Sequence, residues 1–339
     1  MLLNEVIDLL KEQDSLLLFK NARKVRDSIF DRSIFQRGVI EFSNHCRKNC
    51  HYCGLRMDNK ALGRFSMDRS SILATVRIAI ESGMGTIVLQ SGEQDSSGFE
   101  HIGFIIKEIK KNTELAVTLC LGDQSEDTYK LWRDCGADRY LLKAETFDEK
   151  LHSCFRPGQS IKRRLKNVET LQKLGYETGS GIITGLPGMT VEILAEDLLK
   201  LSRLALDMIA VGPFVPHPCT PLGKNVPGAM DESLRAVALL RIMNPLCNIP
   251  STSALDALSA QGRELGLYAG ANVIMPSITP EQVRAGYTIY PGKNSSTISV
   301  KETIGKLQQR VCNAGYQLSS LQGKSPNKNE QDQEFINVQ

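Results

Sequence analysis

Eight short apolar runs, each separated from the next by a longer segment, follow one another through this chain of 339 residues. Because parallel strands need long crossover connections, usually helices, this alternation predicts an α/β protein with a parallel sheet. Eight such units are what closes a (β/α)8 barrel, which is our predicted fold. An open, doubly wound sheet is the alternative, but no G-x-G-x-x-G fingerprint opens the first unit. The runs cover residues 38–43, 86–92, 115–122, 139–145, 177–186, 208–216, 248–254 and 271–278.

The segments between the runs carry helical signals. In residues 161–174 apolar side chains recur every three or four positions on one face, with Lys and Arg on the other, and Gly175 provides the stop. Asp68 or Ser66 can cap the helix that follows the first run, and Thr190 can cap a later one. Each connection is therefore predicted to cross back as a helix.

The barrel does not account for the whole chain. We expect residues 1–36 to form a helical extension outside the barrel and residues 37–290 to form the barrel itself. Residues 291–318 are predicted to form a C-terminal extension that includes a helix from about 300 to 314. Residues 319–339 are polar and nearly free of apolar side chains, so a disordered tail is expected.

Charge and hydropathy exclude several classes of protein. A net charge of +3 is too small to predict binding to nucleic acid or to an anionic membrane surface. No apolar stretch approaches the roughly 20 residues of a membrane-spanning helix. The amino-terminal segment is too charged for a signal peptide. We therefore expect a cytoplasmic protein.

Three of the nine cysteines cluster in the segment SNHCRKNCHYCG, with the spacing C-x3-C-x2-C. Cys46, Cys50 and Cys53 directly follow the first strand, on a loop where barrel enzymes place their chemistry. Closed zinc sites and iron–sulfur clusters normally have four protein ligands. Either His45 or His51 completes a zinc site, or a 4Fe-4S cluster keeps one iron open. The six remaining cysteines are expected to be small, buried hydrophobic residues that stay reduced.

CRKNCHYC resembles the cluster loop of the radical S-adenosylmethionine (SAM) enzymes. In that family three thiolates hold one 4Fe-4S cluster, and SAM chelates the fourth iron through its amino and carboxylate groups. One electron then cleaves the sulfonium to a 5′-deoxyadenosyl radical and methionine. Segments such as TIVLQSGE, GADRYLLKAET, GYETGSGIITGLPGMT and VGPFVPHPCTPL, between about residue 38 and Lys293, are similar to the HydE family of FeFe-hydrogenase maturases.

This resemblance implies roles for further residues. Tyr52 would lie against the adenine of SAM, and Arg164 would pair with its carboxylate, with Arg163 as a neighbouring alternative. The strand-end residues Ser91, Gly92 and Glu93 would meet the amino group, and Glu145 would also contact SAM. The candidates for the substrate cavity are Thr118, Cys120, Thr252, Ser253 and Tyr287. His217 is either catalytic or a residue that orders its loop.

The resemblance also implies partners and leaves alternatives open. The expected substrate is a cysteine-bound iron–carbonyl–cyanide synthon, with reduced ferredoxin or flavodoxin as electron donor and other hydrogenase maturases as possible partners. Cys312 alone lies beyond Pro291, so we expect one cluster. Methylornithine synthase, which acts on lysine, is the alternative enzyme, and Asp256 is compatible with it. Biotin synthase fits less well, and a zinc-stabilised binding protein is the alternative outside enzymes.

Overall fold

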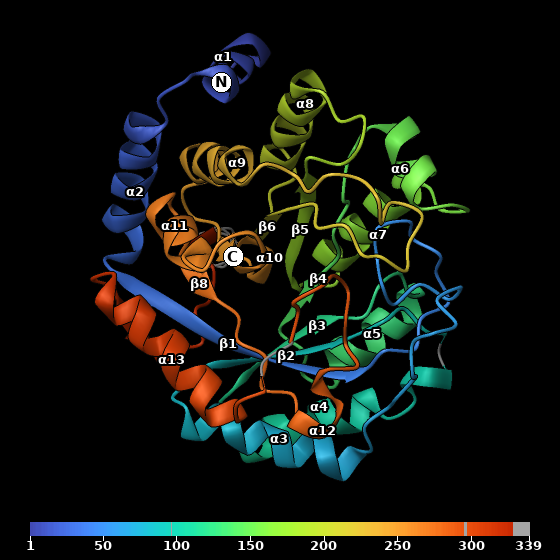
Figure 1. Cartoon of the computed structure of the whole chain (residues 1–339). Coiled ribbons are helices and arrows are strands. Elements are labelled where there is room, and N and C mark those ends of the chain that lie inside the picture. Colours follow the sequence, from blue (N-terminus) through green and yellow to red (C-terminus); the bar gives the residue numbers. More distant parts are fainter. Residues whose placement is uncertain (96, 295–296, 328–339) are drawn as a thin grey trace, which may run out of the picture.

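A ring of parallel strands surrounded by helices forms the centre of the computed structural model, which describes residues 1–95, 97–294 and 297–327 (Figure 1). The order of the strands is β6-β5-β4-β3-β2-β1-β8-β7, and a parallel bridge between Met208 and Asn248 joins the two ends. The predicted (β/α)8 barrel is confirmed. The strands are β1 (Ser33–Ser43), β2 (Thr86–Ser91), β3 (Ala116–Cys120), β4 (Arg139–Leu141), β5 (Glu177–Thr184), β6 (Met208–Pro213), β7 (Pro250–Ser251) and β8 (Val273–Ile274).

Helices cover the outside of the ring, and their starts follow the predicted caps. The side chain of Asp68 accepts a hydrogen bond from the backbone of Ser71, and Thr190 accepts one from Ile193. The helices after the first strand are α3 (Arg69–Glu81), α4 (Ile102–Asn112), α5 (Glu126–Asp134), α6 (Glu149–Phe155), α7 (Ile161–Lys173), α8 (Val191–Ser202), α9 (Met230–Met243), α10 (Ser253–Leu258), α11 (Gly262–Tyr268), α12 (Glu281–Arg284) and α13 (Val300–Asn313). Within the described ranges no helix is both long and apolar enough to cross a membrane.

Two helices precede the barrel, and the first strand starts earlier than predicted. Helices α1 (Leu3–Lys11) and α2 (Leu16–Phe30) pack against α8 and α9. Strand β1 then begins at Ser33 rather than at residue 38, because its first residues pair with β8 and with the short strand β9 (Gln317–Ser319). The expectation that residues 33–36 are part of a helical extension is therefore wrong.

The segment after β9 crosses the end of the barrel at which the strands begin. Asn248, just before β7, donates a side-chain hydrogen bond to the carbonyl of Gly323 at 2.9 Å. The buried Ser325 donates its backbone N–H to Glu177, at the start of β5, at 3.1 Å. This segment therefore covers the end of the barrel opposite the cysteine loop.

These contacts correct the expected tail. The expected disorder is wrong for residues 319–327. Their buried polar groups, which would be costly to bury alone, form hydrogen bonds with residues at the end of the barrel where the strands begin. The rest of the expected tail, residues 328–339, lies outside the described residues.

Candidate active site

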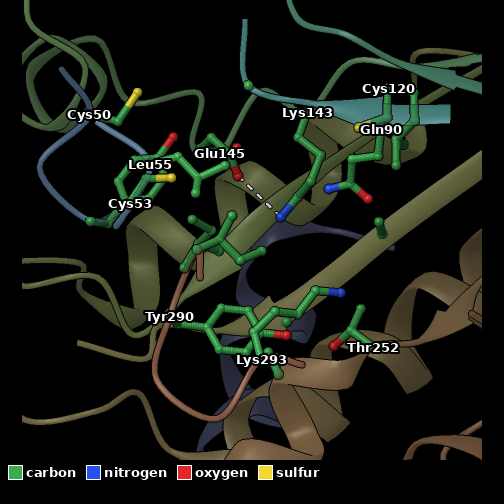
Figure 2. Close-up of a pocket in the computed structure, with 18 of the residues that line it drawn as sticks. Cys50, Cys53, Leu55, Gln90, Cys120, Lys143, Glu145, Thr252, Tyr290 and Lys293 are labelled. Carbon is green, nitrogen blue, oxygen red and sulfur yellow. Dashed lines mark ion pairs between the residues drawn. The ribbon is translucent and has the colours of Figure 1, made fainter. Parts of the chain in front are cut away.

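A cavity of about 340 Å³ opens at the carboxyl ends of the strands. Its walls come from strand ends around the ring, from the loop that follows β1, and from the segment that follows β8. Side chains far apart in the sequence therefore meet here, as expected at this end of a (β/α)8 barrel (Figure 2).

The cysteine loop forms one wall of this cavity. Cys46, Cys50 and Cys53 all line it, and all are free thiols. Backbone hydrogen bonds anchor the loop to three other parts of the barrel: Arg47 to Glu93 at 2.8 Å, His51 to Phe155 at 2.9 Å, and Gly54 to Ile289 at 3.0 Å. The positions of the thiols therefore depend on several loops and not on the cysteine loop alone.

The three thiols are a donor set suited to an iron–sulfur cluster. Burial raises the pKa of Cys46 and of Cys53, so bound metal has to supply the positive charge that favours their thiolates. Among the described residues, no three His, Cys, Asp or Glu side chains surround one point as ligands of a single ion. A cluster binds each thiolate to a different iron and does not need that convergence, whereas a tetrahedral zinc ion does. The zinc alternative would need exposed His45 or half-buried His51 as its fourth ligand.

The turn after β2 packs directly against the cysteine loop. A Cβ atom added to Gly92 would lie 2.3 Å from the carbonyl oxygen of His45 and 2.7 Å from Cβ of Cys46. The neighbouring Glu93 is buried and pairs with Lys48 at 3.1 Å and with Arg47 at 3.2 Å. Gly92 thus allows a close approach that brings a carboxylate to the cavity wall, and Ser91 lines the cavity beside it.

Glu145 stands just beyond β4 in a strained backbone conformation. Its φ is 70°, a left-handed value that is unusual for a residue with a side chain. Its carboxylate lies 3.1 Å from Nζ of Lys143 and 3.7 Å from the guanidinium of Arg156. The ion pair with Lys143 faces the cavity (Figure 2).

Two arginines from one stretch of chain line the same region. Arg164, on α7, is buried and pairs with Asp123 at 3.2 Å. Arg156, at the end of α6, donates a hydrogen bond to the hydroxyl of Tyr52 at 3.0 Å. Two buried guanidinium groups beside the cysteine loop provide fixed positive charge for a carboxylate.

The predicted substrate residues divide into two groups. Cys120, Thr252, Ser253 and Tyr287 line the cavity, whereas Thr118 on β3 does not. Burial raises the pKa of Cys120 to about 11, so this thiol stays protonated near neutral pH. The hydroxyls of Ser253 and Tyr290 lie 2.5 Å apart.

Two other residues considered from the sequence lie elsewhere. His217 does not line the cavity, and its ring instead bonds Thr288 at 3.2 Å and the backbone N–H of Cys219 at 3.1 Å. This arrangement is that of a residue ordering its loop. Asp256 pairs with Arg263 at 2.8 Å and with Arg310 at 2.9 Å, outside the cavity lining.

Several cavity residues were not identified from the sequence. The sequence offered a signal for Lys143 and Arg156. Lys143 interrupts the apolar run before Glu145, and Arg156 directly precedes Pro157. Lys293 carries no such signal, because only the closure of the barrel brings it to the cavity.

Residues 40–201 match the radical SAM superfamily. The chain is 48% identical over 276 residues to the FeFe-hydrogenase maturase subunit HydE of Thermotoga maritima, covering 81% of this chain and 79% of the relative. It is 28% identical to 3-methylornithine synthase of Methanosarcina acetivorans, covering 85% and 82%. The crystal structure of methylornithine synthase (PylB) superposes with a TM-score of 0.84 at 25% identity, covering 94% of each chain.

Proposed function

The chain belongs to the radical SAM superfamily and, within it, to the family of the FeFe-hydrogenase maturase subunit HydE, and from this membership we propose that it is a maturase of FeFe-hydrogenase. The observation that carries the proposal is the meeting of the three thiols with Glu93, Glu145 and Arg164 around one cavity. Membership implies an iron–sulfur cluster and SAM. When bound, these supply one-electron cleavage of the sulfonium.

The residues of this chain would bind and orient those groups. Cys46, Cys50 and Cys53 would each hold one iron of a single 4Fe-4S cluster. A single cluster is proposed because Cys312 is the only cysteine that follows Pro291 in the sequence.

The polar residues around the thiols would orient SAM. Glu93 would pair with its amino group and Arg164 with its carboxylate, because a carboxylate suits an ammonium and a guanidinium suits a carboxylate. Glu145 would contribute a second carboxylate, and Ser91 and Gly92 would supply backbone close to the ligand. Tyr52, whose hydroxyl is tied to Arg156, would cover the adenine.

The proposed substrate is a cysteine-bound iron–carbonyl–cyanide synthon, with Cys120, Thr252, Ser253 and Tyr287 in its cavity. Reduced ferredoxin or flavodoxin would supply the electron, and other maturases would exchange intermediates. The free state of all nine cysteines supports a reducing compartment such as the cytoplasm.

A lysine mutase resembling methylornithine synthase is the alternative function. It shares the fold, but Asp256, the acidic residue that would favour an amino-acid substrate, is engaged by two arginines away from the cavity. The experiment that separates the functions measures SAM cleavage by the reconstituted protein with lysine or with the iron synthon. If only the synthon accelerates SAM cleavage, the maturase function is supported. If only lysine accelerates it, the maturase function is refuted.

A further inference from the structure

The segment from Tyr287 to Lys293 crosses the open end of the barrel. Tyr287, Ile289, Tyr290 and Lys293 all line the cavity. The side chain of Lys293 is only 8% exposed and extends past the ring of Tyr290 on the side where Thr252 lies (Figure 2). A buried ammonium in a cavity wall is costly and calls for a partner.

Glu41 on β1 is one partner of this ammonium. Its carboxylate is fully buried and lies 3.1 Å from Nζ of Lys293, while Ser277 donates a hydrogen bond to its other oxygen at 2.6 Å and Thr279 donates another. Although burial acts to raise the pKa of Glu41, Lys293 and these hydroxyls hold it below its usual value. Glu41 therefore stays ionised and fixes the position of the ammonium.

The ion pair with Glu41 does not use all the donors of this ammonium. An ammonium has three N–H donors, and in the described ranges Glu41 is the side chain that Nζ of Lys293 contacts. In those same ranges the buried hydroxyl of Thr252, also in the cavity wall, has no hydrogen-bond partner. Buried polar groups are nearly always satisfied, so this part of the wall is suited to a ligand that accepts hydrogen bonds.

We propose that Lys293 binds a carboxylate of the substrate, with Glu41 as the positioning residue that holds its ammonium group. This inference rests on the proposed function, because the cysteine portion of the synthon supplies such a carboxylate. Lys143, the other cavity lysine, pairs with Glu145 beside the cysteine loop instead. Lys293 would thus orient the substrate from a different wall than the one that carries Lys143 and Glu145 (Figure 2).

The test compares two synthetic iron(II)–carbonyl–cyanide complexes, one made with L-cysteine and one with cysteamine, which lacks the carboxylate. The reconstituted, SAM-loaded protein is filtered with increasing amounts of each complex, and the retained complex is quantified by its carbonyl infrared bands. A hydrogen bond to a charged group predicts that wild type binds the cysteine complex about tenfold or more tightly than the cysteamine complex. Lys293→Met should abolish this preference, and Lys293→Arg should restore part of it.

A double variant separates binding from charge compensation. Lys293→Met alone leaves the carboxylate of Glu41 buried without its cation, so its folding can suffer. Glu41→Gln with Lys293→Met removes both charges. If Lys293 contacts substrate, the double variant folds and loads iron but still lacks the preference for the cysteine complex. A double variant that regains this preference would show that Lys293 merely neutralises Glu41 and would overturn the inference.

The wild type also distinguishes this inference from the proposed function. Equal retention of the two complexes, or retention of neither, overturns the role of Lys293. If the complexes are retained selectively but neither accelerates SAM cleavage, the maturase proposal fails while the carboxylate site stands.

Discussion

Substitution of Gly92 by alanine tests whether the turn after β2 must touch the cysteine loop. The added Cβ would lie 2.3 Å from the carbonyl oxygen of His45, and ordinary contact begins at 3.4 Å. To restore ordinary contact the loop or the turn would have to move by about 1.1 Å, the difference between these two distances. The obstructing atom belongs to the backbone, so no side-chain rotation can relieve the overlap.

The size of this displacement sets the expected effect. A misplacement of about 1 Å can lower the rate of an enzyme about 100-fold, and overpacking costs about 1–3 kcal/mol of stability. Gly92→Ala should therefore lose about two orders of magnitude in the rate of 5′-deoxyadenosine formation while it still folds. Iron content per chain should fall as well, because Cys46 moves with the carbonyl of His45.

Gly63 provides the matched control. Gly63 lies between β1 and α3, on the stretch that carries the cysteine loop, and a Cβ added there meets no atom within 4 Å. Iron content and 5′-deoxyadenosine formation are measured for both variants after identical reconstitution. Gly63→Ala should match wild type, and a Gly92→Ala protein that also matches wild type would refute the role assigned to this close contact.

Three further predictions concern strain, pH and the carboxyl-terminal segment. In denaturant unfolding, Glu145→Gly should be about 1 kcal/mol more stable than Glu145→Ala, because only glycine adopts a φ of 70° without cost. Both variants should lose SAM cleavage. Equal stability of the two variants would argue against backbone strain at this position. Burial raises the pKa of Asp197 to about 6 from an ordinary 3.8, so the folded chain holds this proton more tightly, and the free energy of unfolding should fall as pH rises between these values. Asp197→Asn should lack this slope in urea titrations, and an unchanged slope would assign it to other groups. A chain ending at Ser319 should have a lower free energy of unfolding than one ending at Asn327, by about 1 kcal/mol for each hydrogen bond lost, and should therefore unfold at a lower denaturant concentration. Coincident unfolding transitions of the two chains would contradict the packing described for this segment.

The sequence predicts the barrel well because each strand is an apolar run between helical signals. It predicts strand lengths poorly. The runs at 248–254 and 271–278 form only the two-residue strands β7 and β8, since the ladder depends on how the ring closes and not on local propensity. Strand β1 starts early because β9, from the far end of the chain, pairs with it.

In the candidate site too, local features could be predicted from the sequence and features that depend on distant partners could not. The cysteine loop could be predicted because its spacing is local and its residue type is rare. The positions of Lys293 and of the segment ending at Asn327 could not be predicted, because the partners of their polar groups are distant in the sequence. Lys293 pairs with Glu41, and Asn327 donates a hydrogen bond to the carbonyl of Leu206. Polar residues without a local pattern look like solvent-exposed loop until those partners are known.

The central claim is that Cys46, Cys50 and Cys53 hold a cluster with one iron open to SAM. The most direct measurement is the electron spin resonance spectrum of the anaerobically reconstituted, reduced protein before and after SAM is added, with 5′-deoxyadenosine quantified in the same samples. Our account predicts a 4Fe-4S spectrum that changes with SAM and product formation by wild type, with both lost in Cys50→Ala. A colourless protein that binds zinc and forms no 5′-deoxyadenosine would contradict it.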